Sequence, residues 1–151
     1  MKPVVGMFGG LALAVVLARR TLTWVTVRGN SMAPTLADGQ RVLAVRSFRY
    51  RRGDIVVFWT PGGRGTRDNP DYRVKRVVAV AGDPRPSWFA PSALPLVVPV
   101  GHVAIGGDGA DSQDSTSLGY VPLAHIRGRA LGHHPISSWF NDAGLDRLAK
   151  N

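Results

Sequence analysis

The sequence predicts a mainly β fold: a compact, antiparallel, β-barrel-like domain that follows an N-terminal membrane-anchoring helix. Three observations favour this fold. An unbroken apolar run covers residues 3–18. After it, short runs of β-type residues alternate with turn-forming residues, at spacings typical of all-β domains rather than of alternating strands and helices. The length of 151 residues allows one domain of ordinary size that can bury a core without disulfides.

The apolar run reads PVVGMFGGLALAVVLA, with Lys2 before it and Arg19 and Arg20 directly after it. At 1.5 Å per residue it spans roughly 24 Å, shorter than the ~30 Å hydrocarbon core, although snorkelling cations can extend it. We therefore expect residues 1–20 to be a transmembrane anchor and residues 21–151 to be a single domain.

Other interpretations of this run remain open. Val16 and Ala18 offer small residues at a spacing that suits cleavage of a secretory signal, but the two arginines that follow disfavour it. A buried core helix is a further alternative. Cations flank both ends of the run, so charge alone does not predict the orientation in the membrane.

Runs of β-type residues recur along the chain after the apolar run. The expected strands are Leu22 to Arg28, Arg41 to Val45, Asp54 to Trp59, Arg73 to Val80, and His102 to Ile105. A mobile hairpin loop is expected over residues 60–72 and a Pro-rich connection over residues 84–99, and residues 136–151 are expected to form a short terminal helix.

Composition limits the chemistry that the chain can perform. There is no Cys, which excludes disulfides, a thiolate zinc site and a cysteine nucleophile. The net charge of +9 comes mainly from Arg, since only Lys2, Lys75 and Lys150 are lysines. A surplus of positive charge of this size indicates an anionic binding partner, either nucleic acid or the headgroups of membrane lipids.

Ser31 is the candidate nucleophile, within the segment GNSMAPTLADG. It follows a β-type run and a Gly-Asn turn, and Pro34 restricts the backbone shortly after it, so we expect an exposed and well-defined bend. Serines of this kind are more often simple turn residues or helix N-caps. A serine hydroxyl becomes a good nucleophile only when a base takes its proton.

Lys75 is the candidate base. It is the only lysine away from the termini, and Val74, Val77 and Val78 provide an apolar environment. Burial disfavours the ammonium form and lowers the pKa of a lysine, which gives a neutral amine near pH 7, whereas arginine stays charged. The competing interpretation is an exposed strand lysine whose stem covers apolar surface.

Four ordered motifs resemble the signal peptidase I family. They are Ser-Met-x-Pro-Thr at 31–35, Arg-Gly-Asp-Ile-Val-Val at 52–57, Lys-Arg-Val-Val-x-x-x-Gly-Asp at 75–83, and Gly-Asp followed by Ser-x-Asp-Ser and Gly-Tyr-Val-Pro within 107–122. The resemblance covers roughly residues 27–129, and the short spacing after residue 83 is similar to mitochondrial inner-membrane proteases and small bacterial maturation proteases.

The resemblance implies a membrane-bound serine endopeptidase with a Ser-Lys dyad. Ser31 would be the nucleophile, with its own N–H as an oxyanion donor, and Lys75 the base. Met32, Ser112 and Asp114 would support the site, Ser112 by orienting the lysine amine. Residues 21–151 would be the catalytic domain, on the extracytoplasmic side of the plasma membrane with a single-pass anchor.

The substrate implied by the resemblance is a preprotein or precursor peptide, cleaved after small residues at the membrane surface. The chain also departs from the family. Gly109 and Ala110 stand where many members have Asn-Arg, and Thr116 stands where they have an arginine that would pair with Asp114. A dedicated protease for one precursor and a weakened family member are therefore alternatives.

Other functions are less well supported. His102, His125, His133 and His134 could serve a Ser-His-Asp hydrolase or a metal site, but there is no Gly-x-Ser-x-Gly motif and no marked third ligand, so we expect neither metal nor cofactor. A self-cleaving repressor-type Ser-Lys peptidase would need a DNA-binding domain.

The nonenzymatic alternative is a membrane-tethered basic binding module. The segment 46–52 interleaves arginines with Phe48 and Tyr50, as contact with phosphates and stacking on bases require. Such a run is more often a solvated hairpin face, and its nearness to the anchor favours lipid headgroups, so no nucleic acid is expected.

Overall fold

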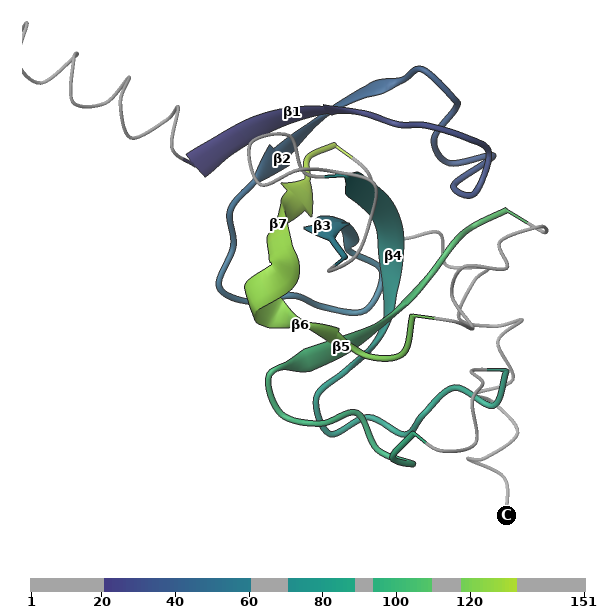
Figure 1. Cartoon of the computed structure of the whole chain (residues 1–151), viewed down its shortest axis with the longest axis vertical. Helices are drawn as coiled ribbons and strands as arrows, with labels where there is room; N and C mark the ends of the chain where they lie inside the picture. The colour runs from purple at the N-terminus through teal and green to yellow at the C-terminus, as the bar shows by residue number, and fades with distance from the viewer. Residues whose placement is uncertain (1–20, 61–70, 89–93, 110–117, 133–151) are drawn as a thin grey trace, which may run out of the picture.

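The computed structural model describes residues 21–60, 71–88, 94–109 and 118–132. In them, seven strands form one antiparallel sheet in the order β1-β2-β7-β3-β4-β5-β6 (Figure 1). The elements are β1 (Leu22–Thr26), β2 (Arg41–Val45), β3 (Ile55–Trp59), β4 (Tyr72–Val80), β5 (His102–Gly106), β6 (Val121–Pro122), the 3-10 helix η1 (Leu123–His125) and β7 (Ile126–Ala130).

The mainly β, antiparallel prediction is confirmed, and each of the five expected strands is present. The described sheet is not closed, however, because β1 and β6 lie at its two ends without pairing to each other (Figure 1). The fold is therefore an open curled sheet rather than a closed barrel. Neither β6 nor β7 was expected from the sequence, although β7 is the strand that joins β2 to β3.

Several predicted segments lie outside the described residues. They are the anchor over residues 1–20, residues 61–70 of the expected hairpin loop, and the expected terminal helix over residues 136–151. Within the described ranges, no helix has both the length and the apolar character needed to cross a bilayer. The division of the chain into an anchor and one domain stays a prediction.

The core lies on both faces of β3. Alternate side chains of a strand point to opposite faces, and here both sets are buried. Ile55 and Val57 pack with residues of β1, β2 and the loop between them. Val56 and Phe58 pack on the other face with residues of β4, β5, β6 and β7. Because β3 also pairs with β4, the β1–β2 end of the sheet and β4 share one hydrophobic core.

Candidate active site

Ser31 lies on a hydrogen-bonded turn in the loop between β1 and β2. The N–H of Ala33 donates to the carbonyl of Asn30 at 3.0 Å, and the N–H of Leu36 donates to the carbonyl of Met32 at 2.8 Å. Ser31 is the residue just inside the first of these turns, and it is partly exposed. The expected exposed bend is therefore present, and the Ala33–Pro34 peptide bond within it is cis.

The base of this loop is held closed by further hydrogen bonds. The N–H of Val27 donates to the carbonyl of Gln40 at 2.8 Å, and the N–H of Gly39 donates back to Val27 at 3.0 Å. The N–H of Gly29 donates to the Asp38 carboxylate at 2.8 Å. Gly29 has a φ of +76°, which favours glycine because other residues strain there. The loop is thus a defined structure on which a side chain can be placed.

Met32 and Leu36 anchor the same loop in the core. Both side chains are 0% exposed and belong to the cluster that contains Ile55 and Val57. The neighbour of Ser31 in the chain is therefore fixed by packing, while Ser31 itself stays accessible. Met32 supports the bend as an apolar anchor, which is a physical basis for its predicted supporting position.

Lys75 is a buried lysine on β4. It lies opposite Val56 in the ladder between β3 and β4, and its exposure is 2%. Val74 and Val77, from which an apolar environment was expected, are also buried. Removing an ammonium group from water costs several kcal/mol, so a lysine at such a position is rare without a partner or a function.

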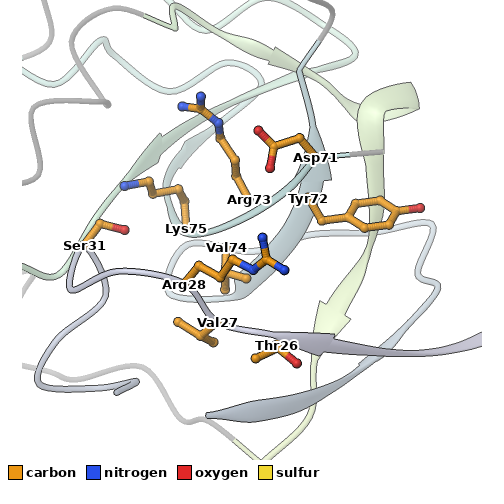
Figure 2. Close-up of a pocket in the computed structure, with 9 residues that line it drawn as sticks. All are labelled: Thr26, Val27, Arg28, Ser31, Asp71, Tyr72, Arg73, Val74 and Lys75. Carbon is orange, nitrogen blue, oxygen red and sulfur yellow. The ribbon is translucent and has the colours of Figure 1, made fainter. Parts of the chain in front are cut away.

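Ser31 and Lys75 line the same pocket, which has a volume of about 190 Å³ (Figure 2). In Figure 2 the amine end of Lys75 extends to the end of the pocket where Ser31 lies. The lining consists of Thr26, Val27, Arg28 and Ser31 on the β1 side, and of Asp71, Tyr72, Arg73, Val74 and Lys75 on the β4 side. Drug-sized ligand sites measure roughly 300–1,000 Å³, so this pocket is smaller than those sites.

An ion pair lies next to Lys75 in the chain. Arg76 Nε donates to Asp108 Oδ1 at 2.8 Å, and its Nη2 donates to Oδ2 at 2.6 Å. The two side chains are 0% and 1% exposed. Arg76 also donates to the Gly53 carbonyl at 2.8 Å and to the Thr35 hydroxyl at 3.3 Å. One guanidinium thus ties β4 to the segment after β5, to the turn before β3 and to the Ser31 loop.

The segment after β5 also contacts the Ser31 loop directly. The N–H of Gly109 donates to the carbonyl of Ser31 at 3.1 Å. Arg76 and Asp108 lie within the family-like motifs and Gly109 at a departure from them, and the sequence indicated no role for any of the three. An arginine within a valine-rich strand was the available signal, because a buried arginine requires a carboxylate partner.

The structure describes only some of the other predicted site residues. Ser112 and Asp114 lie outside the described residues, so their supporting roles stay predictions. His102 and His125 are described and do not line the pocket; His125 stacks on Trp59 with ring centroids 4.4 Å apart. In the part of the chain that the structure describes, no group of three or more potential ligands could bind a metal ion.

The arginine-rich segment 46–52 forms part of the connection between β2 and β3. Phe48 is 89% exposed there, while Arg52 binds the carboxylate of Asp83 through two nitrogens, with an Nε–Oδ2 distance of 2.7 Å. This hydrogen bonding lowers the pKa of Asp83 below its usual 3.8 and raises the pKa of Arg52. At least one of these arginines therefore has a structural partner.

Comparison with known proteins connects this site to characterised sequences. Residues 2–84 match the family described as signal peptidase, peptidase S26. The chain is 42% identical over 114 residues to the mitochondrial ATP-independent inner membrane protease subunit 1b of Arabidopsis thaliana, covering 68% of this chain and 64% of the relative. It thus spans less than two thirds of that relative.

Two further relatives are similar to different extents. The chain is 39% identical over 125 residues to the mitochondrial inner membrane protease subunit 1 of Xenopus tropicalis, covering 76% of this chain and 71% of the relative. It is 40% identical over 73 residues to signal peptidase IB of Staphylococcus aureus, covering 45% of this chain and 34% of the relative.

Proposed function

Because the chain belongs to the signal peptidase family, peptidase S26, we propose that it is a membrane-bound serine endopeptidase that removes signal peptides or a precursor leader after small residues. The observation that carries the proposal is the joint presence of Ser31 and a 2%-exposed Lys75 on the lining of one pocket. A buried amine favours its neutral form, which is the form that accepts a proton.

In the proposed mechanism, neutral Lys75 takes the proton of the Ser31 hydroxyl as the serine oxygen attacks the carbonyl carbon of the substrate. The backbone N–H of Ser31 stabilises the resulting oxyanion. Collapse breaks the C–N bond, and the ammonium of Lys75 gives its proton to the leaving amine. Lys75 then deprotonates a water molecule that attacks the acyl-enzyme. Collapse of this second intermediate breaks the ester bond to Ser31, and the ammonium of Lys75 returns its proton to the serine oxygen, which regenerates both residues.

The substrate is proposed to bind as an extended segment beside β1. This strand lies at one end of the sheet order, and residues 26–28 at its end line the pocket. Main-chain pairing along a strand edge holds a peptide in register and leaves pockets to select alternate side chains. The volume of about 190 Å³ suits small side chains next to the scissile bond. Membrane lipids are the proposed surroundings of this reaction.

The proposal is tested by measuring the cleavage of a detergent-solubilised test preprotein. The variants are Ser31→Ala, Lys75→Ala and Lys75→Arg. Ser47→Ala is a matched control, because Ser47 is also a turn serine, whose hydroxyl donates to the Arg49 carbonyl, and it does not line the pocket. We expect the three site variants to fall to background and the control to keep its activity. Arginine keeps the positive charge but does not act as the base.

Two other outcomes have a clear meaning. Full activity in the Lys75 variants would overturn the dyad, while loss in the Ser47 control would show that the assay reports damage to the fold. If the wild type cleaves only one of a panel of membrane-protein precursors, the enzyme is a dedicated maturation protease. Products identified by mass spectrometry define the residue before the cleaved bond.

A further inference from the structure

Gly109 approaches the Ser31 loop more closely than any other residue type could without movement. A Cβ atom placed on Gly109 would lie 2.6 Å from the carbonyl oxygen of Asn30 and 3.5 Å from the Cα and carbonyl carbon of Ser31. Even favourable carbon–oxygen contacts lie at about 3.3–3.6 Å. The atom in the way belongs to the backbone, so a side-chain rotation cannot remove the clash.

The carbonyl that a Cβ would strike shapes the bend at Ser31. Asn30 O accepts the N–H of Ala33 at 3.0 Å, and this bond closes the turn that contains Ser31. The carbonyl of Ser31 itself accepts the N–H of Gly109 at 3.1 Å. Gly109 therefore contacts the backbone on both sides of the Ser31 amide nitrogen, which is the proposed oxyanion donor.

Gly109 is itself fixed relative to β4. It follows Asp108, whose carboxylate is bound by Arg76, and Arg76 follows Lys75 on β4. The contacts thus run from the strand that carries the amine, through a buried ion pair, to the backbone of the serine. This series sets where Ser31 lies relative to Lys75.

We propose that Gly109 is a positioning residue for Ser31, and that its missing side chain lets the segment after β5 hold the serine backbone in place for attack. This inference rests on the proposed function of Ser31 as nucleophile.

The test compares Gly109→Ala with Gly128→Ala in the full chain. Gly128 is a matched control because a Cβ there would lie 2.7 Å from another backbone oxygen, that of Val45, in the contact between β7 and β2. We expect Gly109→Ala to lower kcat about 100-fold with little change in KM, since small misplacements of reacting groups cost about that much. Gly128→Ala should lose thermal stability and keep its kcat.

Hydrogen exchange followed by NMR gives a readout that does not depend on substrate. In Gly109→Ala we expect faster exchange at the amides of Ala33 and Leu36, which report the two turns of the loop. In Gly128→Ala these amides should keep their protection. Normal kcat together with unchanged exchange in Gly109→Ala would overturn the proposal.

The two proposals fail in different ways. If Ser31→Ala still cleaves the test preprotein, the proposed function fails, yet the exchange at Ala33 and Leu36 still decides whether Gly109 positions the loop. If Gly109→Ala does not fold, hydrogen exchange at the Gly109 amide of the wild-type protein tests the proposal instead. Strong protection supports its bond to Ser31, and exchange as fast as that of an open loop contradicts it.

Discussion

The guanidinium of Arg76 and the carboxylate of Asp108 form a doubly hydrogen-bonded ion pair that solvent does not reach, with side-chain exposures of 0% and 1%. Among the described residues, no buried polar side-chain atom lacks a hydrogen-bond partner. Two further donors of Arg76 reach Gly53 and Thr35. A charge pair with this many partners fixes the relative position of three segments next to the pocket.

Removal of one member of this pair should destabilise the protein strongly. We expect Asp108→Ala to lower the free energy of unfolding by about 3–5 kcal/mol, because it leaves a buried guanidinium without its carboxylate. The double variant Arg76→Met with Asp108→Leu should lose less, since no charge then stays buried. Urea unfolding followed by circular dichroism measures both. Equal losses in the two variants would mean that packing, not charge, dominates.

Lys75→Met should separate function from stability. Methionine fills similar space without a charge to desolvate, so we expect the free energy of unfolding to stay within about 1 kcal/mol of the wild type or to rise. Cleavage should fall by about 100- to 10,000-fold, the usual contribution of general acid–base catalysis. Thermal unfolding and the preprotein assay measure the two effects. A strongly destabilised variant would assign Lys75 a structural role instead.

Met32→Ala should weaken the anchor of the Ser31 loop. The side chain is 0% exposed, and truncation of a buried methionine to alanine costs about 2–5 kcal/mol. Met32→Leu conserves volume and should cost less than about 1.5 kcal/mol. Denaturant unfolding of the two variants checks this order. Similar stability of Met32→Ala and the wild type would show that the loop is not held by this contact.

The Arg52–Asp83 pair should give a pH-dependent contribution to stability. The pKa of Asp83 is lowered in the folded protein, chiefly by its hydrogen bonds to Arg52, so the contribution is complete above the usual pKa of 3.8 and is lost as the pH falls through the lower folded value. Arg52 is 41% exposed, so the effect should be at most about 1 kcal/mol.

Thermal unfolding of Arg52→Gln and of the wild type between pH 7 and pH 2 measures this contribution. We expect the difference between them to shrink as the pH falls below 3.8 and to disappear below the lower pKa of Asp83 in the folded protein, where its carboxylate is protonated. Arg51→Gln is the matched control, because the contact of Arg51 with Asp54 uses its backbone N–H. A difference between Arg52→Gln and the wild type that persists at the lowest pH would come from another cause.

The strands that the sequence predicted correctly are those with strong local signals. The valine-rich runs of β3 and β4 are bounded by turn residues, and both are found close to their expected limits. β7 reads IRGRA, and a glycine between two arginines does not favour a strand. Its glycine is required by a distant neighbour, because a Cβ on Gly128 would strike Val45 O. Such long-range pairing is not visible in the local pattern.

The site residues also fall into two groups: those that the sequence was enough to select and those whose role only the folded structure reveals. Residue type, spacing and family resemblance were enough to select Ser31 and Lys75, and the fold brings both to one pocket. The role inferred for Gly109 depends on an approach between segments far apart in the chain that is so close that a Cβ placed on Gly109 would lie 2.6 Å from the carbonyl oxygen of Asn30. No periodicity or motif in the sequence encodes that approach.

The place of β7 in the sheet has a consequence for biosynthesis. The hairpin of β1 and β2 is joined to β3 and β4 by backbone hydrogen bonds only through β7, among the strands that the structure describes. During translation, the ladder that connects these two parts cannot form before residue 130 has left the ribosome. Ser31 and Lys75 lie on opposite sides of that junction, so a nascent chain carries both residues long before it holds them in a completed sheet.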